Sequence, residues 1–135
     1  MGVMYTVVDV TVHGDHAGNL VALEKGKEFL FEVKRVYYIW GTEKNAVRGR
    51  HAHKKLEQLI VCLSGSCDFI LDDGTNRVAY KLNTPTKGIY IKSKVWREFT
   101  NFTRDCIVMV LASEQYDESD YIRNYEEFIK LTNDA

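Results

Sequence analysis

Short segments rich in β-branched and aromatic residues recur along this 135-residue chain, and they constrain its fold more than any other feature. Turn-forming residues separate several of them, at residues 64–65, 72–74 and 84–86, and the Asp-Asp-Gly turn at 72–74 predicts a hairpin. The segments are 5–12, 20–23, 31–40, 48–53, 58–63, 67–71, 77–82, 88–91, 96–101 and 106–111. This succession of short strands predicts an all-β sandwich or barrel.

The end of the chain departs from this pattern. Between residues 118 and 131 the apolar residues recur at helical spacing, and Asp117 or Ser119 is available as an N-terminal cap. The apolar stripe is formed by Tyr121, Ile122, Tyr125, Phe128 and Ile129. We expect one short C-terminal α-helix that packs on the outside of the barrel, with its tyrosines in core contacts and not at a ligand site.

Composition limits the classes of function. A chain that is 45% apolar and 27% charged can bury a core without disulfides or metal, so we expect one domain over residues 1–135. A net charge of −1 gives no general basic field for nucleic acid. The chain lacks an apolar run of the roughly 18 residues that a membrane helix needs, and its start, MGVMYTVVDV, lacks the features of a signal peptide. Cys62, Cys67 and Cys106 are expected to be reduced core residues, and the protein is expected to be cytoplasmic.

Two histidines lie one residue apart within RGRHAHKKLEQ, residues 48–58. On an extended strand, His51 and His53 point to the same face. Together with Glu57 they resemble the first half of the ligand set of a cupin, which suits either a metal ion or proton transfer. Glu57 could equally form a surface ion pair of little consequence.

Position 97 decides between a metal and a proton-transfer site. Metal-binding cupins take a further ligand from a histidine that is followed by three residues and an asparagine, and here the matching stretch, residues 88–101, has Arg97 instead. A guanidinium stays protonated and has no lone pair, so it cannot coordinate a cation and would repel one nearby. We therefore expect no metal. The pocket suits abstracting a proton from a negatively charged substrate or stabilising an oxyanion on it.

Strand alternation groups the pocket candidates. Arg35 and Tyr37 share one face of segment 31–40, while its even-numbered residues share the other. Arg97, Phe99 and Asn101 share one face of segment 96–101. The predicted lumen is lined by Arg35, Tyr37, His51, His53 and Arg97. Alternation leaves two alternatives open, since Arg97 could be a structural ion-pair partner and Tyr37 could simply fill the core.

Five longer stretches resemble the dTDP-4-oxo-6-deoxy-D-glucose 3,4-ketoisomerases. They are VKRVYYIWG (33–41), RGRHAHKKLEQLIVCLSGSC (48–67), LDDG (71–74), GIYIKSKVWREF (88–99) and VLASEQYDESDYIRNYEEF (110–128). They cover about half of the chain, in the family's order. The second and fifth stretches are far longer than a bare pair of histidines, which makes a chance similarity improbable.

The resemblance implies a small cupin or jelly-roll barrel that forms a homodimer with exchanged N-terminal strands and uses no metal or organic cofactor. Its substrate would be dTDP-4-oxo-6-deoxy-D-glucose, and the reaction would move the ketone from carbon 4 to carbon 3. The product would then pass to a PLP-dependent 3-aminotransferase, on the way to 3-amino-3,6-dideoxy sugars of bacterial surface glycans such as the O-antigen of lipopolysaccharide.

Residue roles follow from combining this chemistry with the pocket. The hydrogen at carbon 3 is acidic because it lies next to the ketone, so a neutral His51 can remove it as general base. His53 and Tyr37 would orient the base or relay protons, and Arg97 would stabilise negative charge near the sugar. Substrate contacts are expected from Arg35, Arg48, Lys54, Tyr90 and Phe99, with the two arginines on the diphosphate.

The family divides by the configuration of its product at carbon 4. Members that form the galacto product have histidine in place of Arg97 and arginine in place of Ala17, whereas gluco-type members have arginine and tyrosine there. This chain matches the gluco type at Arg97 and departs from both at Ala17, next to His16. The gluco product is favoured, and the galacto product stays possible.

Two other functions stay open. A nucleotide-sugar 3,5-epimerase also uses a histidine base, although such chains are typically longer and carry different pocket motifs. A non-catalytic sugar-binding cupin needs no base near neutral pH, so it should keep its affinity when His51 is replaced by alanine or asparagine.

Overall fold

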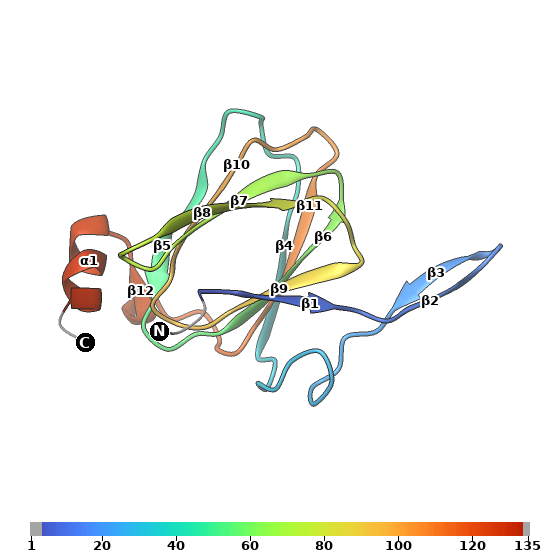
Figure 1. Ribbon diagram of the computed structural model, residues 1–135, viewed down its shortest axis with the longest axis horizontal. Coiled ribbons are helices and arrows are strands. Elements are labelled where there is room, and N and C mark those ends of the chain that lie inside the picture. Colours follow the sequence, from blue (N-terminus) through green and yellow to red (C-terminus); the bar gives the residue numbers. More distant parts are fainter. Residues whose placement is uncertain (1–3, 134–135) are drawn as a thin grey trace.

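The computed structural model describes residues 4–133, which form two five-stranded antiparallel sheets around a shared core. The first sheet has the strand order β1-β9-β6-β11-β4 and the second has the order β12-β5-β10-β7-β8 (Figure 1). Strands β2 and β3 form a separate two-stranded sheet. The predicted all-β, cupin-like architecture with one short C-terminal α-helix is confirmed.

Each of the ten predicted segments overlaps a strand, and β5 and β8 agree with the prediction at both ends. The strands are β1 (Thr6–Asp9), β2 (Val12–Asp15), β3 (Gly18–Val21), β4 (Arg35–Ile39), β5 (Arg48–His53), β6 (Gln58–Ser64), β7 (Cys67–Asp72), β8 (Arg77–Leu82), β9 (Lys87–Ile91), β10 (Trp96–Thr100), β11 (Ile107–Ala112) and β12 (Tyr121–Ile122). Within residues 4–133, strands β2 and β12 were not expected. The predicted hairpin at residues 72–74 joins β7 to β8.

The hairpin of β2 and β3 extends away from the barrel, at the end opposite the C-terminal helix (Figure 1). All its strand residues are exposed except the half-buried Val21. Its turn carries His16 and Ala17, and the backbone N–H of Ala17 donates to Asp15 Oδ1 at 2.7 Å. In this protomer the hairpin tip therefore lies in solvent, away from the core.

Alternating side chains of both sheets fill the space between them. On β6, Ile60 and Cys62 belong to this core, while Leu59 belongs to a second cluster on the outer face of the sheet. Phe69 and Phe99 stack in the core with ring centroids 4.5 Å apart. Burial of one such ring stabilises the fold by about 1.5–3 kcal/mol. The three cysteines are free and buried in the same core, as predicted.

The outer face of the first sheet is partly covered by the segment between β3 and β4. Phe29 and Phe31 of this segment are buried against Leu59 and Leu111. Val36, Tyr38 and Trp40, on and just after the edge strand β4, remain 53%, 64% and 68% exposed. An apolar strip at this edge thus faces solvent.

The C-terminal helix begins later than predicted. Asp117 accepts a hydrogen bond from the backbone N–H of Ser119, but it caps only the short 3₁₀ helix η1 (Glu118–Asp120). The next two residues form β12, and helix α1 (Tyr125–Asn133) starts after Asn124, whose side chain accepts from the backbone N–H of Glu127 at 3.0 Å. Phe128 of α1 is fully buried against the outside of the second sheet, as expected.

None of the helices in residues 4–133 is long and apolar enough to cross a bilayer. The start of the chain, where no signal peptide is predicted, includes residues 1–3. These lie outside the described residues, as do residues 134–135 at the end of the predicted domain.

Candidate active site

The candidate site is built around an irregularity in β5. Opposite β10, His51 pairs with Arg97 and Gly49 pairs with Glu98, so Arg50 is an extra residue without a partner on the other strand. Gly49 and Arg50 both have positive φ, at 90° and 49°. A Cβ at Gly49 would lie 3.2 Å from the carbonyl oxygen of Arg97, so glycine allows the two strands to approach closely here.

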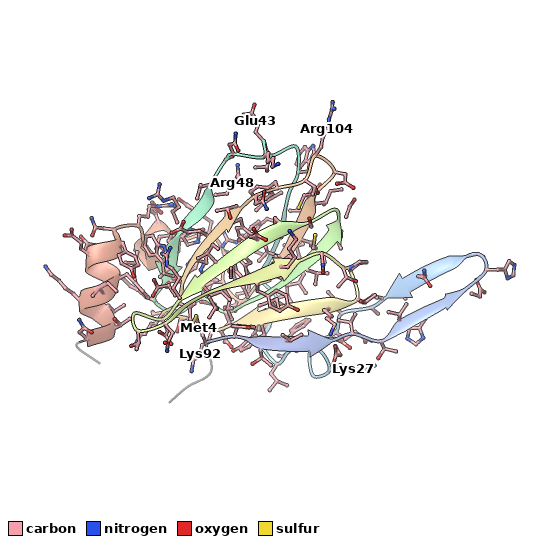
Figure 2. All side chains as sticks on the ribbon, turned by 45° about the horizontal axis from the view of Figure 1, so that its top comes forward. Met4, Lys27, Glu43, Arg48, Lys92 and Arg104 are labelled. Atoms are coloured by element: carbon pink, nitrogen blue, oxygen red, sulfur yellow. The ribbon has the colours of Figure 1, made fainter. Side chains whose placement is uncertain are left out.

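This bulge changes which side chains share a face. Regular alternation puts Arg48 on the face opposite His51. With one extra residue between them, Arg48 pairs with Phe99 and turns to the same side as His51. Figure 2 shows Arg48 on the side of the barrel that also carries Glu43 and Arg104.

A cavity of about 360 Å³ opens beside His51. Strands β4, β5 and β10 supply most of its walls, and the segment that begins with β12 supplies the rest. Its lining consists of Arg35, Tyr37, Tyr38, Ile39, Arg48, Gly49, His51, Phe99, Tyr121 and Arg123. Five of the predicted site residues are therefore brought together at one opening.

The ring of His51 is held as a neutral base. Its Nδ1 lies 2.8 Å from the carbonyl oxygen of Gly49, which can only accept, so Nδ1 carries the proton and Nε2 keeps its lone pair. Burial, and then the charge of Arg97, lower the pKa of His51 from 6.5 to about 4. At neutral pH an unprotonated Nε2 is therefore available beside the cavity.

His53 lies behind His51 and is fully buried, with the two ring centroids 4.7 Å apart. Its Nδ1 donates to the carboxylate of Asp120 at 3.1 Å, and that carboxylate also accepts from the backbone N–H of Lys55. Burial, and then the charge of Arg97, lower the pKa of His53, and the hydrogen bond to the Asp120 carboxylate fixes its tautomer. The Nε2 atoms of both histidines are buried and have no hydrogen-bond partner among the described residues.

Arg97 lies beneath the cavity, with only 1% of its surface exposed. Its guanidinium donates to the backbone oxygen of Val95 and to the side-chain oxygen of Gln58. Gln58 in turn donates to the hydroxyl of Tyr37 at 3.0 Å. Burial lowers the pKa of Arg97 to about 10, which still leaves it charged at neutral pH. A fixed positive charge therefore lies behind Tyr37 and the two histidines.

Three guanidinium groups border the cavity. Arg35 stacks on Tyr37, 5.3 Å from the ring centroid, and its buried Nε and Nη2 atoms have no hydrogen-bond partner within residues 4–133. Arg48 is exposed at the rim, and Arg123 lies 4.4 Å from the ring centroid of Tyr121 while it pairs with the exposed Glu118. This concentration of positive charge suits a diphosphate.

Two predicted substrate contacts do not lie at this cavity. Lys54 follows the last residue of β5, and its side chain is exposed beyond the pair of histidines. Tyr90 faces the outer side of the first sheet and donates a hydrogen bond to Glu57, because its neighbours Ile89 and Ile91 fill the core. The structure therefore places Lys54 and Tyr90 apart from the other predicted site residues, and it separates Glu57 from the histidines.

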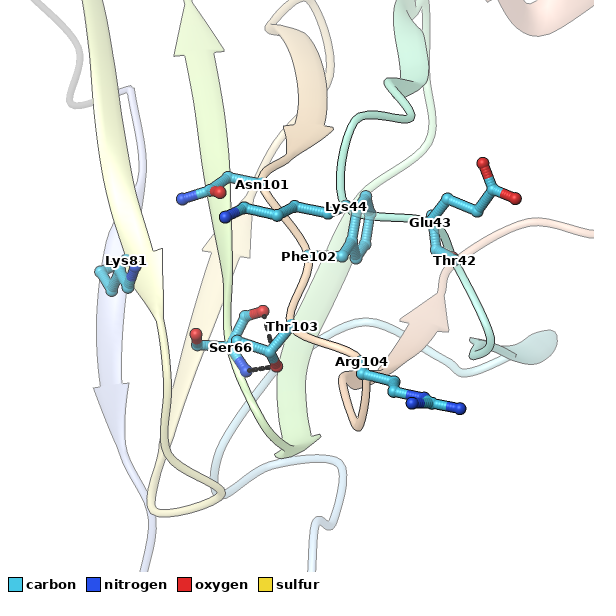
Figure 3. Close-up of a pocket in the computed structure, with 9 residues that line it drawn as sticks. All are labelled: Thr42, Glu43, Lys44, Ser66, Lys81, Asn101, Phe102, Thr103 and Arg104. Carbon is cyan, nitrogen blue, oxygen red and sulfur yellow. Dashed lines mark hydrogen bonds between the residues drawn. The ribbon is translucent and has the colours of Figure 1, made fainter.

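Asn101 also differs from the alternation of its strand. It has a positive φ of 55° just after β10, and its side chain donates to Asp68 at the barrel end. It borders a different pocket, of about 560 Å³, with exposed Lys44 and Arg104 nearby (Figure 3). That pocket holds no histidine, and its Lys81 is 3.5 Å from Asp68.

The sequence interpretation missed four residues of the site, namely Gln58, Asp120, Tyr121 and Arg123. Tyr121 was assigned to the core face of a helix, but its ring centroid lies 4.8 Å from that of His51 and 4.4 Å from that of His53. Strand parity could have found Gln58, since it shares the inward face of β6 with Ile60. The other three belong to a stretch that carries the family resemblance.

The described residues contain no cluster of three or more histidine, cysteine, aspartate or glutamate side chains that could hold a metal ion. On the strand where a metal-binding cupin would supply its later histidine, the guanidinium of Arg97 is bonded to protein oxygens. The absence of a metal cofactor stays a prediction from this residue set.

Comparison with known proteins agrees with this site. The family model FdtA, described as WxcM-like, C-terminal, matches residues 3–133. A TDP-4-oxo-6-deoxy-alpha-D-glucose-3,4-oxoisomerase from Aneurinibacillus thermoaerophilus is 53% identical over 116 residues, which cover 86% of this chain and 84% of that protein. Two solved structures are similar over nearly their whole length. The WlaRB TDP-quinovose 3,4-ketoisomerase from Campylobacter jejuni is 48% identical, with a TM-score of 0.90 and coverage of 93% and 97%. The H51N mutant of the 3,4-ketoisomerase QdtA from Thermoanaerobacterium thermosaccharolyticum, in complex with TDP-4-keto-6-deoxyglucose, is 40% identical, with a TM-score of 0.95 and coverage of 99% and 97%.

Proposed function

This chain belongs to the FdtA family, and from that premise we propose that it is a TDP-sugar 3,4-ketoisomerase that converts TDP-4-oxo-6-deoxy-D-glucose to its 3-oxo isomer. The observation that carries the proposal is the neutral His51 in a cavity backed by the buried charge of Arg97. A general base and a source of electrostatic stabilisation are the two elements that an enolisation needs.

The reaction begins with transfer of the carbon 3 proton to Nε2 of His51. The electron pair of the broken C–H bond forms a double bond between carbons 3 and 4, and the ketone oxygen becomes an enediolate oxygen. The proton of the carbon 3 hydroxyl then moves to the oxygen on carbon 4, and carbon 4 takes up a proton. For the gluco product this proton comes from water on the face opposite His51, and His51 releases its own proton to solvent; for the galacto product His51 itself returns the proton. The product carries the ketone at carbon 3, so the reaction is an isomerisation without net oxidation.

Other residues support this sequence of steps. The charge of Arg97 favours the enediolate because it lies in a low-dielectric interior. Tyr37 and His53 are positioned to relay protons between the two oxygens, and Asp120 keeps His53 in one tautomer. Arg35 and Arg48 are proposed to bind the diphosphate, with Phe99 forming an apolar wall.

We propose the gluco configuration for the product, with the galacto configuration as the alternative. The chain has Arg97, which resembles gluco-type members of the family. The 48% identical relative from C. jejuni is named a TDP-quinovose 3,4-ketoisomerase, and quinovose has the gluco configuration. Ala17 matches neither type, so the face of reprotonation has to be measured.

The protein is further proposed to act as a homodimer in which N-terminal strands are exchanged. The exposed β2–β3 hairpin projects away from the barrel, and the apolar strip of Val36, Tyr38 and Trp40 is a surface that a partner could bury. In such a dimer the hairpin tip with His16 and Ala17 could approach the partner's cavity.

The cellular setting is part of the proposal. A 3-oxo product is the substrate type of a PLP-dependent 3-aminotransferase, which leads to 3-amino-3,6-dideoxy sugars of surface glycans. We place the enzyme in the cytoplasm as a single domain over residues 1–135, and its free buried cysteines are compatible with a reducing compartment.

Proton NMR of the protein with TDP-4-oxo-6-deoxy-D-glucose in deuterium oxide tests the function directly. The product is trapped with a 3-aminotransferase and an amino donor. A 3-amino sugar is expected, and in a parallel reaction in ordinary water, where carbon 4 takes up hydrogen, the coupling of the carbon 4 proton separates the gluco from the galacto product. Recovery of unexchanged substrate would contradict the proposal in favour of a binding protein, and deuterium at carbon 5 would indicate an epimerase.

A further inference from the structure

A single buried amide joins Arg97, whose charge stabilises the enediolate in the proposed reaction, to Tyr37, which relays protons there. Gln58 is the first residue of β6 and is only 1% exposed. Its oxygen accepts from Nη1 of Arg97, and its Nε2 lies 3.0 Å from the hydroxyl oxygen of Tyr37. We propose that Gln58 is a positioning residue that turns the Tyr37 hydroxyl into a hydrogen-bond donor toward the substrate.

The direction of the two hydrogen bonds that link Arg97, Gln58 and Tyr37 follows from the chemistry of Arg97. A guanidinium has donors only, so the oxygen of the Gln58 amide must face it. The NH₂ group must then face Tyr37, and an NH₂ group can only donate. The Tyr37 oxygen is therefore an acceptor toward Gln58. Its own proton is left to point elsewhere, and Tyr37 lines the cavity beside His51.

The protonation states agree with this direction. Burial raises the pKa of Tyr37 above its ordinary value, so the hydroxyl keeps its proton at neutral pH. The pKa of Arg97 is lowered by burial, but only to about 10, so the guanidinium remains charged. A charged donor at one end of a hydrogen-bonded chain polarises the donors that follow it. The buried charge of Arg97 therefore makes the hydroxyl of Tyr37, which lines the cavity, a stronger hydrogen-bond donor.

This arrangement has a defined task in the isomerisation, and the inference rests on the proposed function. When His51 removes the proton from carbon 3, negative charge develops on the oxygen at carbon 4. A hydrogen bond from Tyr37 to that oxygen becomes stronger as the charge grows. It therefore stabilises the transition state more than the bound substrate, and so it lowers the barrier. Gln58 touches no substrate atom in this scheme, and it acts through Tyr37.

The sharpest test is Gln58→Glu, which is nearly isosteric. The carboxylate keeps an acceptor for Arg97, but it also presents an acceptor to Tyr37, whose hydroxyl then donates to residue 58 and is withdrawn from the cavity. We expect kcat for TDP-4-oxo-6-deoxy-D-glucose to fall about 100-fold while KM changes less than about twofold. Gln115→Glu, an exposed position with the same chemical change, is the control and should keep wild-type kcat.

The coupling to Tyr37 is tested in a double-mutant cycle of Tyr37→Phe with Gln58→Met, which removes the amide without placing a charge beside Arg97. If Gln58 acts through Tyr37, this double variant loses no more kcat than Tyr37→Phe alone. Multiplying losses would overturn the inference, as would wild-type kcat in either Gln58→Glu or Tyr37→Phe. Thermal melting and calorimetric titration with TDP separate this role from a structural one, since a damaged barrel would also lose Tm and TDP affinity. Tyr37→Phe keeps the test decisive if Gln58→Glu does not fold.

The two levels of proposal are distinguishable in the same assay. Wild-type protein that does not isomerise the sugar overturns the proposed function and this inference with it. Active wild-type protein with an unaffected Gln58→Glu variant overturns only the role of Gln58.

Discussion

Acidification should destabilise this protein by protonating His51, and the effect can be calculated from the structure. The pKa of His51 is lowered from 6.5 in a solvated chain to about 4 in the fold, chiefly by burial and then by Arg97. Between these two values the unfolded chain binds more protons than the folded one, so lowering the pH favours unfolding. The stability is fully present above about pH 6.5 and is lost progressively as the pH falls toward 4.

The size of the effect follows from the difference of about 2.5 in pKa. Each pKa unit corresponds to about 1.4 kcal/mol, so the complete loss is about 3 kcal/mol. Between about pH 7.5 and pH 5, where the fold should still persist, linkage gives a loss of about 2 kcal/mol from His51 alone. A typical domain has only about 5–15 kcal/mol of stability, so a change of this size is readily measured.

Urea unfolding at several pH values measures the effect, with the fluorescence of the buried Trp96 as one reporter of unfolding. Protein concentration is held constant, since the stability of a dimer depends on it. Wild-type protein and His51→Asn are compared, because the carboxylates that also titrate are common to both. The loss between pH 7.5 and pH 5 should be about 2 kcal/mol smaller in His51→Asn.

Phe99→Leu is the matched control for a change in the same cavity, because it alters packing but removes no ionisable group. It should show the wild-type dependence on pH even if it is less stable at every pH. Equal pH dependence in wild type and His51→Asn would refute the reasoning, since it would mean that the cavity does not hold His51 in its neutral form.

Three further predictions follow from the same structure. The pH profile of kcat/KM should fall on the acid side with an apparent pKa near 4, and a limb near 6.5 would show that the base is not held neutral by its surroundings. Asp120→Asn should lower kcat at least about 10-fold with the fold intact by circular dichroism, because an amide can donate to His53 and so reverse its tautomer; unchanged kcat would exclude His53 from the proton relay. Phe69→Ala should destabilise the fold by about 3–5 kcal/mol in urea titrations, since this side chain is fully buried in the core, and a loss below 1 kcal/mol would contradict the core assignment.

The strands of the barrel could be predicted because the types and order of their residues indicate which positions are buried and where the turns lie. β8 agrees at both ends, since Asn76 and Asn83 bound a run of residues suited to a pleated surface, whereas β5 was found from its two histidines at alternate positions. β2 escaped prediction because all four of its residues are exposed, and no buried face imposes an apolar alternation on them. Its pairing with β3 is visible only in three dimensions.

The start of the C-terminal helix was predicted wrongly for a different reason. Apolar residues at helical spacing were read as one stripe, but Tyr121 and Ile122 take their backbone partners from His53 and Ala52 of β5. Ile122 and Phe128 still belong to the same buried cluster. The apolar residues of β12 and α1, which pack on one surface, thus resembled the stripe of a single helix. For this reason Tyr121 was not included in the predicted site.

Alternation within a strand predicted which side chains face the cavity where the strand is regular. Arg35 and Tyr37 face the cavity as expected, and Val36 between them is largely exposed; Tyr38 is also largely exposed, although it borders the same cavity. The same rule, applied to Ile89 and Ile91, would have shown that Tyr90 faces outward. The position of Arg48 could not be predicted in this way, because it depends on the bulge in β5 and not on alternation.

The buried charge of Arg97 connects the features that remain. A base must be unprotonated to abstract a proton, and an enediolate is stabilised by a positive charge close by. These two needs conflict if the positive charge is a protonated lysine, because its ammonium group can itself donate a proton. A guanidinium avoids this conflict, because its pKa stays near 10 even when fully buried. Together with burial, which has the larger effect, it lowers the pKa of His51, so that the base is unprotonated. It also fixes the direction of the Gln58 amide without giving up a proton. Arginine at position 97 therefore does more than exclude a metal ligand, since the protonation state and the orientation of the surrounding groups both depend on it.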